Sequence, residues 1–105
     1  MRAFGIIALA AVAAAYTLFG QDLAERARQR ERSGDVQDAR QILQRAARGA
    51  AHDAAALAAY AEFLDRYRDP GTRGAYERLL AALGPSEREQ RVRVARRLLE
   101  LDLLD

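Results

Sequence analysis

Residues 57–83 read LAAYAEFLDRYRDPGTRGAYERLLAAL, and this stretch decides the fold because it carries two amphipathic helical patterns. The apolar residues of the first pattern recur at helical spacing, at Leu57, Tyr60, Ala61, Leu64 and Tyr67. Those of the second pattern do the same, at Ala75, Tyr76, Leu79, Ala82 and Leu83. Residues 69–72, Asp-Pro-Gly-Thr, separate the two patterns and favour a turn. The stretch therefore predicts an antiparallel pair of helices that cover each other's apolar sides.

The composition extends this helical prediction to the whole chain. Alanine, the strongest helix former, is the commonest apolar residue, and no run alternates apolar and polar side chains as a strand would. The 17 basic residues are all arginine and are interleaved with 15 acidic residues, which is typical of an ion-paired surface and not of a nucleic-acid footprint. Cysteine is absent, which excludes disulfides and cysteine metal sites. We therefore expect an all-α protein with no cofactor, no metal and no nucleic-acid partner.

The N-terminus has the pattern of a targeting segment. Met1 and Arg2 precede an uncharged apolar run at residues 3–20, AFGIIALAAVAAAYTLFG, which is typical of a secretory signal peptide. Cleavage is expected after Gly20 or after Ala15. An uncleaved anchor is the main alternative, because a helix of 18 residues spans about 27 Å, close to the thickness of a hydrocarbon core. A third interpretation of residues 3–20 is an ordinary helix buried in the protein. The protein is thus expected to be exported (periplasmic or extracellular) or membrane-anchored, with membrane contact only through residues 3–20.

Residues 21–105 are expected to form one helical domain. Apolar periodicity predicts helices over residues 22–33, 36–48, 53–68 and 72–83, and a last helix that starts within residues 85–89 and continues over residues 90–105. Residues with capping preferences mark the expected helix ends: Gly34 and Asp35 after the first helix, Asp53 and Thr72 before the third and fourth, and a Ser86-x-x-Glu89 capping box before the last.

The last predicted helix has an apolar side with no stop signal after it. The residues predicted for this side are Val92, Ala95, Leu98, Leu99 and Leu103. An apolar helix end favours packing against another helix, either from a continuation of the chain or from a second chain. Self-association through Leu98, Leu99 and Leu103 is therefore one interpretation.

The helix pairs repeat with a period of about 34 residues. Leu23 and Ala27 of the first pair recur one period later as Leu57 and Ala61. The second helices match at a slightly longer separation, with Ala39, Leu43 and Ala46 recurring as Ala75, Leu79 and Ala82. A two-residue insertion in the turn at positions 69–72 accounts for the difference.

In this pattern the chain resembles the tetratricopeptide repeat family, whose units place a large and a small apolar residue four positions apart, a Gly-Asp turn, then alanine, a large apolar residue and alanine. The resemblance covers residues 22–83, and residues 85–105 look like the first helix of a third unit. Arg30 stands where the family usually has an aromatic residue, and Arg48 and Gly49 replace the usual run into a proline.

The resemblance implies a short solenoid of stacked hairpins that acts as a non-catalytic scaffold for protein–protein interaction. The partner would be a protein or peptide, held in a concave surface lined by the first helix of each unit. The candidate binding residues on that surface are Arg26, Arg30, Tyr60, Phe63 and Arg93. Hairpin-core packing is the alternative role for Tyr60 and Tyr76, whereas Phe63 or Tyr67 would anchor a bound peptide by facing the groove.

Other polar groups in the chain favour structural roles over chemistry. His52 and Asp53 are adjacent at a helix start, so their side chains point in different directions and make a poor acid–base pair. Three carboxylates on one predicted helix side could attract a cation, but Arg66 and Arg68 beside them favour ion pairing; these are Glu62, Asp65 and Asp69. The aliphatic hydroxyls all have signal, cap or turn roles, which leaves no serine nucleophile.

Five arginines of the last helix could hold an acidic partner or a phosphate, although three glutamates among them favour a solvated face; the arginines are Arg88, Arg91, Arg93, Arg96 and Arg97. Two further interpretations of the whole chain stay open. It could be the N-terminal helical region of a longer exported enzyme, or a small anchored assembly factor that oligomerises through its last turns.

Overall fold

The computed structural model describes residues 22–49 and 53–104, and within these ranges all regular structure is α-helical. The predicted all-α class is confirmed for this part of the chain. The helices are residues 22–32, here named the N-terminal helix, then α2 (Val36–Gly49), α3 (Ala54–Arg66), α4 (Thr72–Ala82) and α5 (Arg88–Leu104). None of the helices described is long and apolar enough to cross a membrane. The predicted targeting segment at residues 3–20 lies outside the described ranges.

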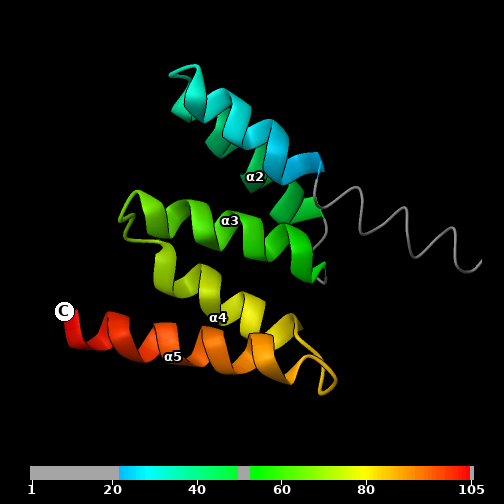
Figure 1. The fold of residues 1–105 in the computed structure, drawn as a ribbon, viewed down its shortest axis with the longest axis vertical. Coiled ribbons are helices and arrows are strands. Elements are labelled where there is room, and N and C mark those ends of the chain that lie inside the picture. Colours follow the sequence, from blue (N-terminus) through cyan, green and yellow to red (C-terminus); the bar gives the residue numbers. More distant parts are fainter. Residues whose placement is uncertain (1–21, 50–52, 105) are drawn as a thin grey trace, which may run out of the picture.

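Successive helices reverse direction and lie in a row (Figure 1). α2 packs against α3, α3 against α4, and α4 against α5. The stretch 57–83 thus forms the predicted pair of oppositely directed helices. Residues 22–48 are not detached from this pair, because Ala27 and Leu43 belong to the same buried cluster as Leu57, Leu79 and the α5 residue Val94. A single interior runs through the helices described.

Alanine lies where these helices approach most closely. Ala27 in the N-terminal helix, Ala39 in α2 and Ala61 in α3 are between 0% and 1% exposed. A methyl side chain keeps the separation between two helix backbones small, because ridges and grooves can interlock without a bulky residue between them. The small residues that repeat through the sequence are therefore packing residues of the shared interior.

Two of the predicted helix boundaries follow directly from capping chemistry. Gly34 has a φ of +85°, the left-handed region that glycine occupies without steric cost at a helix end. The Asp35 carboxylate then accepts a hydrogen bond from the backbone N–H of Asp38 at 3.1 Å. Asp53 caps α3 in the same way and accepts from the N–H groups of Ala55 and Ala56. The capping roles predicted for Gly34, Asp35 and Asp53 are confirmed.

The predicted cap at Thr72 is wrong, because Thr72 is the first residue of α4 and Gly71 precedes it as the N-cap. The turn is organised instead by Asp69. Its carboxylate accepts from the N–H of Gly71 at 2.8 Å, and its carbonyl accepts from the Thr72 hydroxyl at 2.7 Å. α3 also ends at Arg66, two residues before the predicted end at Arg68.

The predicted capping box at Ser86 is also displaced. α5 begins at Arg88, so Glu87 is its N-cap and its carbonyl accepts from the N–H of Arg91 at 3.0 Å. The Glu87 carboxylate reaches back to the N–H of Gly84 at 2.8 Å. A local hydrogen bond across the turn has thus taken the place of the bonds that Ser86 and Glu89 were predicted to form.

α5 turns a different side toward the interior than its apolar pattern predicts. Val94 is buried, and Leu98 and Leu101 pack partly buried against the core. Of the five residues predicted for the packed side, only Leu98 lies there. Val92, Leu99 and Leu103 are 47%, 65% and 86% exposed. The helix carries two apolar stripes at helical spacing, and only one of them packs against α4.

Two glycines test how backbone conformation contributes to this fold. Gly34→Ala is expected to lower the free energy of unfolding by about 1 kcal/mol, because an alanine at a φ of +85° is strained although no atom lies near its Cβ. Gly74→Ala, in the first turns of α4 and equally free of contacts, is expected to raise it by about 0.5 kcal/mol through helix propensity. Urea denaturation of both variants measures the two shifts. Equal shifts of the same sign would contradict the left-handed cap.

Candidate functional site

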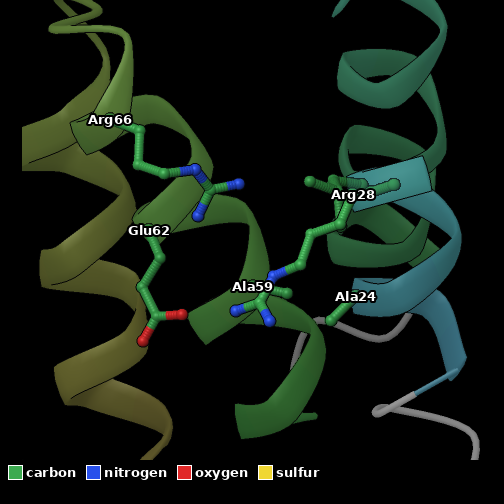
Figure 2. Close-up of a pocket in the computed structure, with 7 residues that line it drawn as sticks. Ala24, Arg28, Ala59, Glu62 and Arg66 are labelled. Atoms are coloured by element: carbon green, nitrogen blue, oxygen red, sulfur yellow. The ribbon is translucent and has the colours of Figure 1, made fainter. Parts of the chain in front are cut away.

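A partly enclosed hollow lies between the N-terminal helix and α3 (Figure 2), and we name it the inter-helix groove. Its lining residues are Ala24, Ala27, Arg28, Leu43, Ala59, Glu62 and Arg66. In Figure 2, Arg28 extends from the N-terminal helix toward α3, where Glu62 and Arg66 lie. The alanine side chains in the lining are small, so the two helix backbones can approach each other closely.

The volume of the inter-helix groove limits what it can hold. Its space of about 10 Å³ matches a single water molecule. Sites for small molecules and cofactors usually enclose several hundred Å³ (roughly 300–1,000). The groove is therefore too shallow for a cofactor. Contact with another polypeptide would therefore be made over its rim, where the side chains of Arg28 and Glu62 are exposed.

The charges beside the groove divide into engaged and free groups. Arg66 forms an ion pair with Glu31 at 2.9 Å, and the same carboxylate accepts a hydrogen bond from the Tyr67 hydroxyl at 2.9 Å. That hydrogen bond raises the pKa of Tyr67 above its ordinary value. Arg28 and Glu62 have no ion-pair partner within the described residues, and both are exposed. The groove thus offers one cation and one anion to a partner.

The structure divides the five candidate residues between surface and interior. Arg26, Arg30 and Arg93 are exposed, whereas Tyr60 is 9% exposed and Phe63 is fully buried. The expectation that Phe63 faces a groove is therefore replaced by a place in the core. The reason is that α3 has neighbours on two sides, α2 and α4, so a wider arc of its surface is covered than one stripe predicts.

The surroundings of Phe63 show how this core position is built. Its ring lies 4.9 Å from that of Tyr67, measured between centroids, in a tilted arrangement. The guanidinium groups of Arg40 and Arg66 lie 5.5 Å and 5.8 Å from its centroid. These distances are within the range of cation–π attraction. Phe63 thus joins α2 to α3, and of the two aromatic anchors proposed from the sequence only Tyr67 is on the surface, at 42% exposed.

The three exposed arginines are not brought together into one site. Arg26 and Arg30 lie in the N-terminal helix, and Arg93 lies in α5 at the other end of the row (Figure 1). Arg30 is also engaged within its own hairpin, in an ion pair with Asp38 at 3.1 Å. Of the predicted residues, Arg26 is exposed and near the groove along the chain, but it does not line it.

Arg28 was not identified from the sequence, and the ion pairing predicted for Glu62 is not formed within the described residues. A signal that both residues line the groove is nevertheless present. They are separated by the same interval at which Ala27 recurs as Ala61. In a repeat array, positions one period apart lie on the same side of successive units. The repeat register therefore identifies both residues once the packed positions, Ala27 and Ala61, are known.

Asp65 on α3 was predicted to form ion pairs. In the structure its carboxylate bonds side chains from two other helices. It accepts two hydrogen bonds from the Arg97 guanidinium, both at 2.8 Å, and one from the Tyr76 hydroxyl at 2.8 Å. The bonds from Arg97 are the main reason that the pKa of Asp65 lies below its ordinary value. Burial, together with the bond to Asp65, raises the pKa of Tyr76. One carboxylate thus connects α3, α4 and α5.

Asp69 is engaged in a similar way. The N–H of Gly71 and an ion pair with Arg40 at 2.9 Å hold the pKa of the Asp69 carboxyl below its ordinary value. Ion pairing is thus the role of Asp65 and Asp69, but with Arg97 and Arg40 in place of the predicted neighbours Arg66 and Arg68. No group of three potential metal ligands occurs within the described residues.

Comparisons with known proteins found no match: no family model fits the chain, and no curated protein or solved structure is significantly similar to it. Function is therefore inferred from the geometry of the molecule itself.

Proposed function

We propose that this chain is a non-catalytic scaffold of tetratricopeptide type that binds a protein or peptide segment across the inter-helix groove, through the exposed side chains at its rim. In the cell it would be exported, or held at a membrane by residues 3–20. The observation that carries the proposal is that Arg28 and Glu62, which are one repeat period apart, line the same groove. Two equivalent positions of successive units thus face one potential ligand.

The packing of the two hairpins supports the repeat interpretation. Ala27 and Ala61 are one period apart in the first helices of the two hairpins, and they are 1% and 0% exposed. Ala39 and Ala75 hold matching positions in the second helices and are 0% and 3% exposed. Each hairpin therefore buries a small residue at the matching place in its first and in its second helix. Such agreement favours two copies of one structural unit.

The chemistry of the groove supports binding as its activity. Its lining presents methyl groups, aliphatic carbon, two guanidinium groups and one carboxylate. These groups recognise charge and shape in a polypeptide through charge-assisted hydrogen bonds, which are the stronger kind. The free cation at Arg28 and the free anion at Glu62 would select a segment that carries an acidic and a basic side chain at a matching distance.

A peptide selection tests this proposal. Peptides selected from a random display library on the wild-type chain are expected to bind Arg28→Glu at least 10-fold more weakly, because the reversed charge meets the partner's acidic group in the groove. Fluorescence anisotropy of labelled peptides measures the dissociation constants. Arg30→Glu is expected to have a smaller effect, since Arg30 already pairs with Asp38.

Arg45→Glu is the matched control, because Arg45 is exposed on α2 and does not line the groove. It carries the same charge change and is expected to leave the affinity within about 2-fold, which is the size of effect at an uninvolved surface site. Equal losses in Arg28→Glu and Arg45→Glu would show nonspecific attraction to a basic protein. That result would sink the groove as the binding site.

A further inference from the structure

The outer side of α5 carries an apolar stripe that nothing else in the described chain covers. Val92, Leu99 and Leu103 are 47%, 65% and 86% exposed, and Ala95 between them is exposed as well. Their spacing of three, four and four residues places them on one side of the helix. We name these four residues the α5 stripe. A continuous apolar side on the surface of a helix is a feature of interaction sites.

Two open hollows adjoin the N-terminal half of the α5 stripe. The first, of about 460 Å³, is bounded by Val92 and Ala95 on α5 and by Leu80 and Pro85 from α4 and the following turn. The second, of about 410 Å³, lies against Val92 on the other flank and includes Arg93. The stripe is thus a ridge between shallow depressions, which side chains from a second helix could enter.

The residues that flank the α5 stripe are predominantly cationic. Four exposed arginines in its N-terminal half have no ion-pair partner within the described chain, and they are Arg88, Arg91, Arg93 and Arg96. Among the acids of α5, Glu100 is paired with Arg97 and Asp102 with Arg73. Glu89 is the remaining acid of this helix. Within α5 the free charges are therefore four positive and one negative.

We propose that the α5 stripe docks an amphipathic helix of a partner protein whose polar flanks are acidic. The four apolar side chains would pack against the apolar side of that helix, with the ridge of one helix between side chains of the other. The free arginines would form ion pairs with its acidic flanks and increase the association rate. α5 has 17 residues and is about 25 Å long, so a partner helix of about 18 residues would cover it.

The charges also argue against a second copy of this chain as the occupant. A parallel pairing of two α5 stripes would bring four free arginines of one chain near four of the other, and an antiparallel pairing would place them beside the last turns of the other copy. The two acids in the last turns, Glu100 and Asp102, are already engaged with arginines of their own chain. Like charges held close across an interface are unfavourable. An amphipathic helix with acidic flanks would cover the apolar stripe and also form ion pairs with the free arginines.

A pair of synthetic helical peptides of 18 residues (about the length of α5) tests the inference. Both carry leucine at every third or fourth position, and the remaining positions are mostly glutamate in one peptide and mostly lysine in the other. Fluorescence anisotropy is expected to show that the glutamate peptide binds at least 10-fold more tightly. The double variant Leu99→Asp, Leu103→Asp is expected to reduce its affinity at least 10-fold. Both positions are exposed, so the fold is retained, and circular dichroism verifies this.

Leu104→Asp is the matched control. Leu104 is 76% exposed on the same helix but lies off the stripe, so this variant is expected to keep the affinity within about 2-fold. Arg28→Glu is expected to keep it as well, because the inter-helix groove is a separate surface, and the two proposals can therefore fail independently. Equal affinity for both peptides would overturn the inference. So would a dimer in light scattering that the double variant dissociates, because a second copy would then occupy the stripe.

Discussion

Phe63→Ala is expected to lower the free energy of unfolding by about 3–5 kcal/mol, the largest effect of any single change considered for this protein. The Phe63 side chain is fully buried between α2 and α3, so truncation leaves a cavity as well as removing apolar area from the interior. The guanidinium groups of Arg40 and Arg66 would also lose the ring that they face. For a small domain this loss is a large part of the whole stability. Urea denaturation followed by circular dichroism measures it.

Leu104→Ala serves as the comparison, since Leu104 is 76% exposed and its truncation is expected to change stability by less than about 0.5 kcal/mol. If Phe63→Ala instead cost less than about 1 kcal/mol, the ring would not be a core residue. Phe63 would then return as an anchor for a bound peptide, as the sequence pattern suggested.

Asp65→Ala is expected to lower the free energy of unfolding by about 2–3 kcal/mol, because it leaves Arg97 and Tyr76 without their shared acceptor. Three hydrogen bonds of 2.8 Å that connect three helices are lost together. The exposed pair between Arg30 and Asp38 provides the contrast. Asp38→Ala is expected to cost less than about 1 kcal/mol, the usual range for a surface ion pair. Similar losses in both variants would contradict the special role of Asp65.

The same carboxylate gives stability a dependence on pH. The pKa of Asp65 in the folded chain lies below its ordinary value of 3.8, chiefly because Arg97 donates hydrogen bonds to it. The unfolded chain therefore takes up the proton first as the pH falls, and the stability from this carboxylate is complete above about pH 5 and is lost below the ordinary pKa. The wild type should lose more stability between pH 5 and pH 2 than Asp65→Asn does. Denaturation at each pH tests this difference.

The fold was predictable where local chemistry determines it. Gly34 and Asp35 form a turn through their own backbone freedom and capping ability, and Asp53 caps α3 with no help from distant residues. The prediction at Thr72 was wrong because Asp69 bonds the N–H of Gly71 and the hydroxyl of Thr72, so that the helix starts one residue earlier than the capping preference of Thr72 indicates. Short-range competition of this kind shifts helix ends by a residue or two.

The orientation of α5 depends on tertiary contacts and could not be predicted from its pattern. Val94 and Leu98 on one side, and Val92 and Leu99 on the other, have the same helical spacing, so periodicity alone does not choose between them. The bonds from Arg97 to Asp65 bring the first side toward α3 and α4. These two residues are 32 positions apart, and no local rule connects them.

The positions of the candidate residues could not be predicted from single helices. Choosing Phe63 as a surface anchor assumed that α3 buries a single stripe, whereas helices lie on both of its sides. Arg28 and Glu62 line one hollow from two different helices, and the pattern of a single helix does not show which residues of another helix lie beside it. The repeat period contained this information, since it relates the two positions directly.

The row of helices has a consequence for how the molecule comes together and apart. Backbone contacts among the labelled helices join only neighbours along the chain, α2 with α3, α3 with α4 and α4 with α5. Folding can therefore nucleate at the central α3–α4 pair and grow outward by short loop closures, which are fast. Among the labelled helices α5 packs against α4 alone, so it is one end from which the array can fray. A partner bound along α5 would hold this end of the row in place and would therefore slow unfolding that starts there.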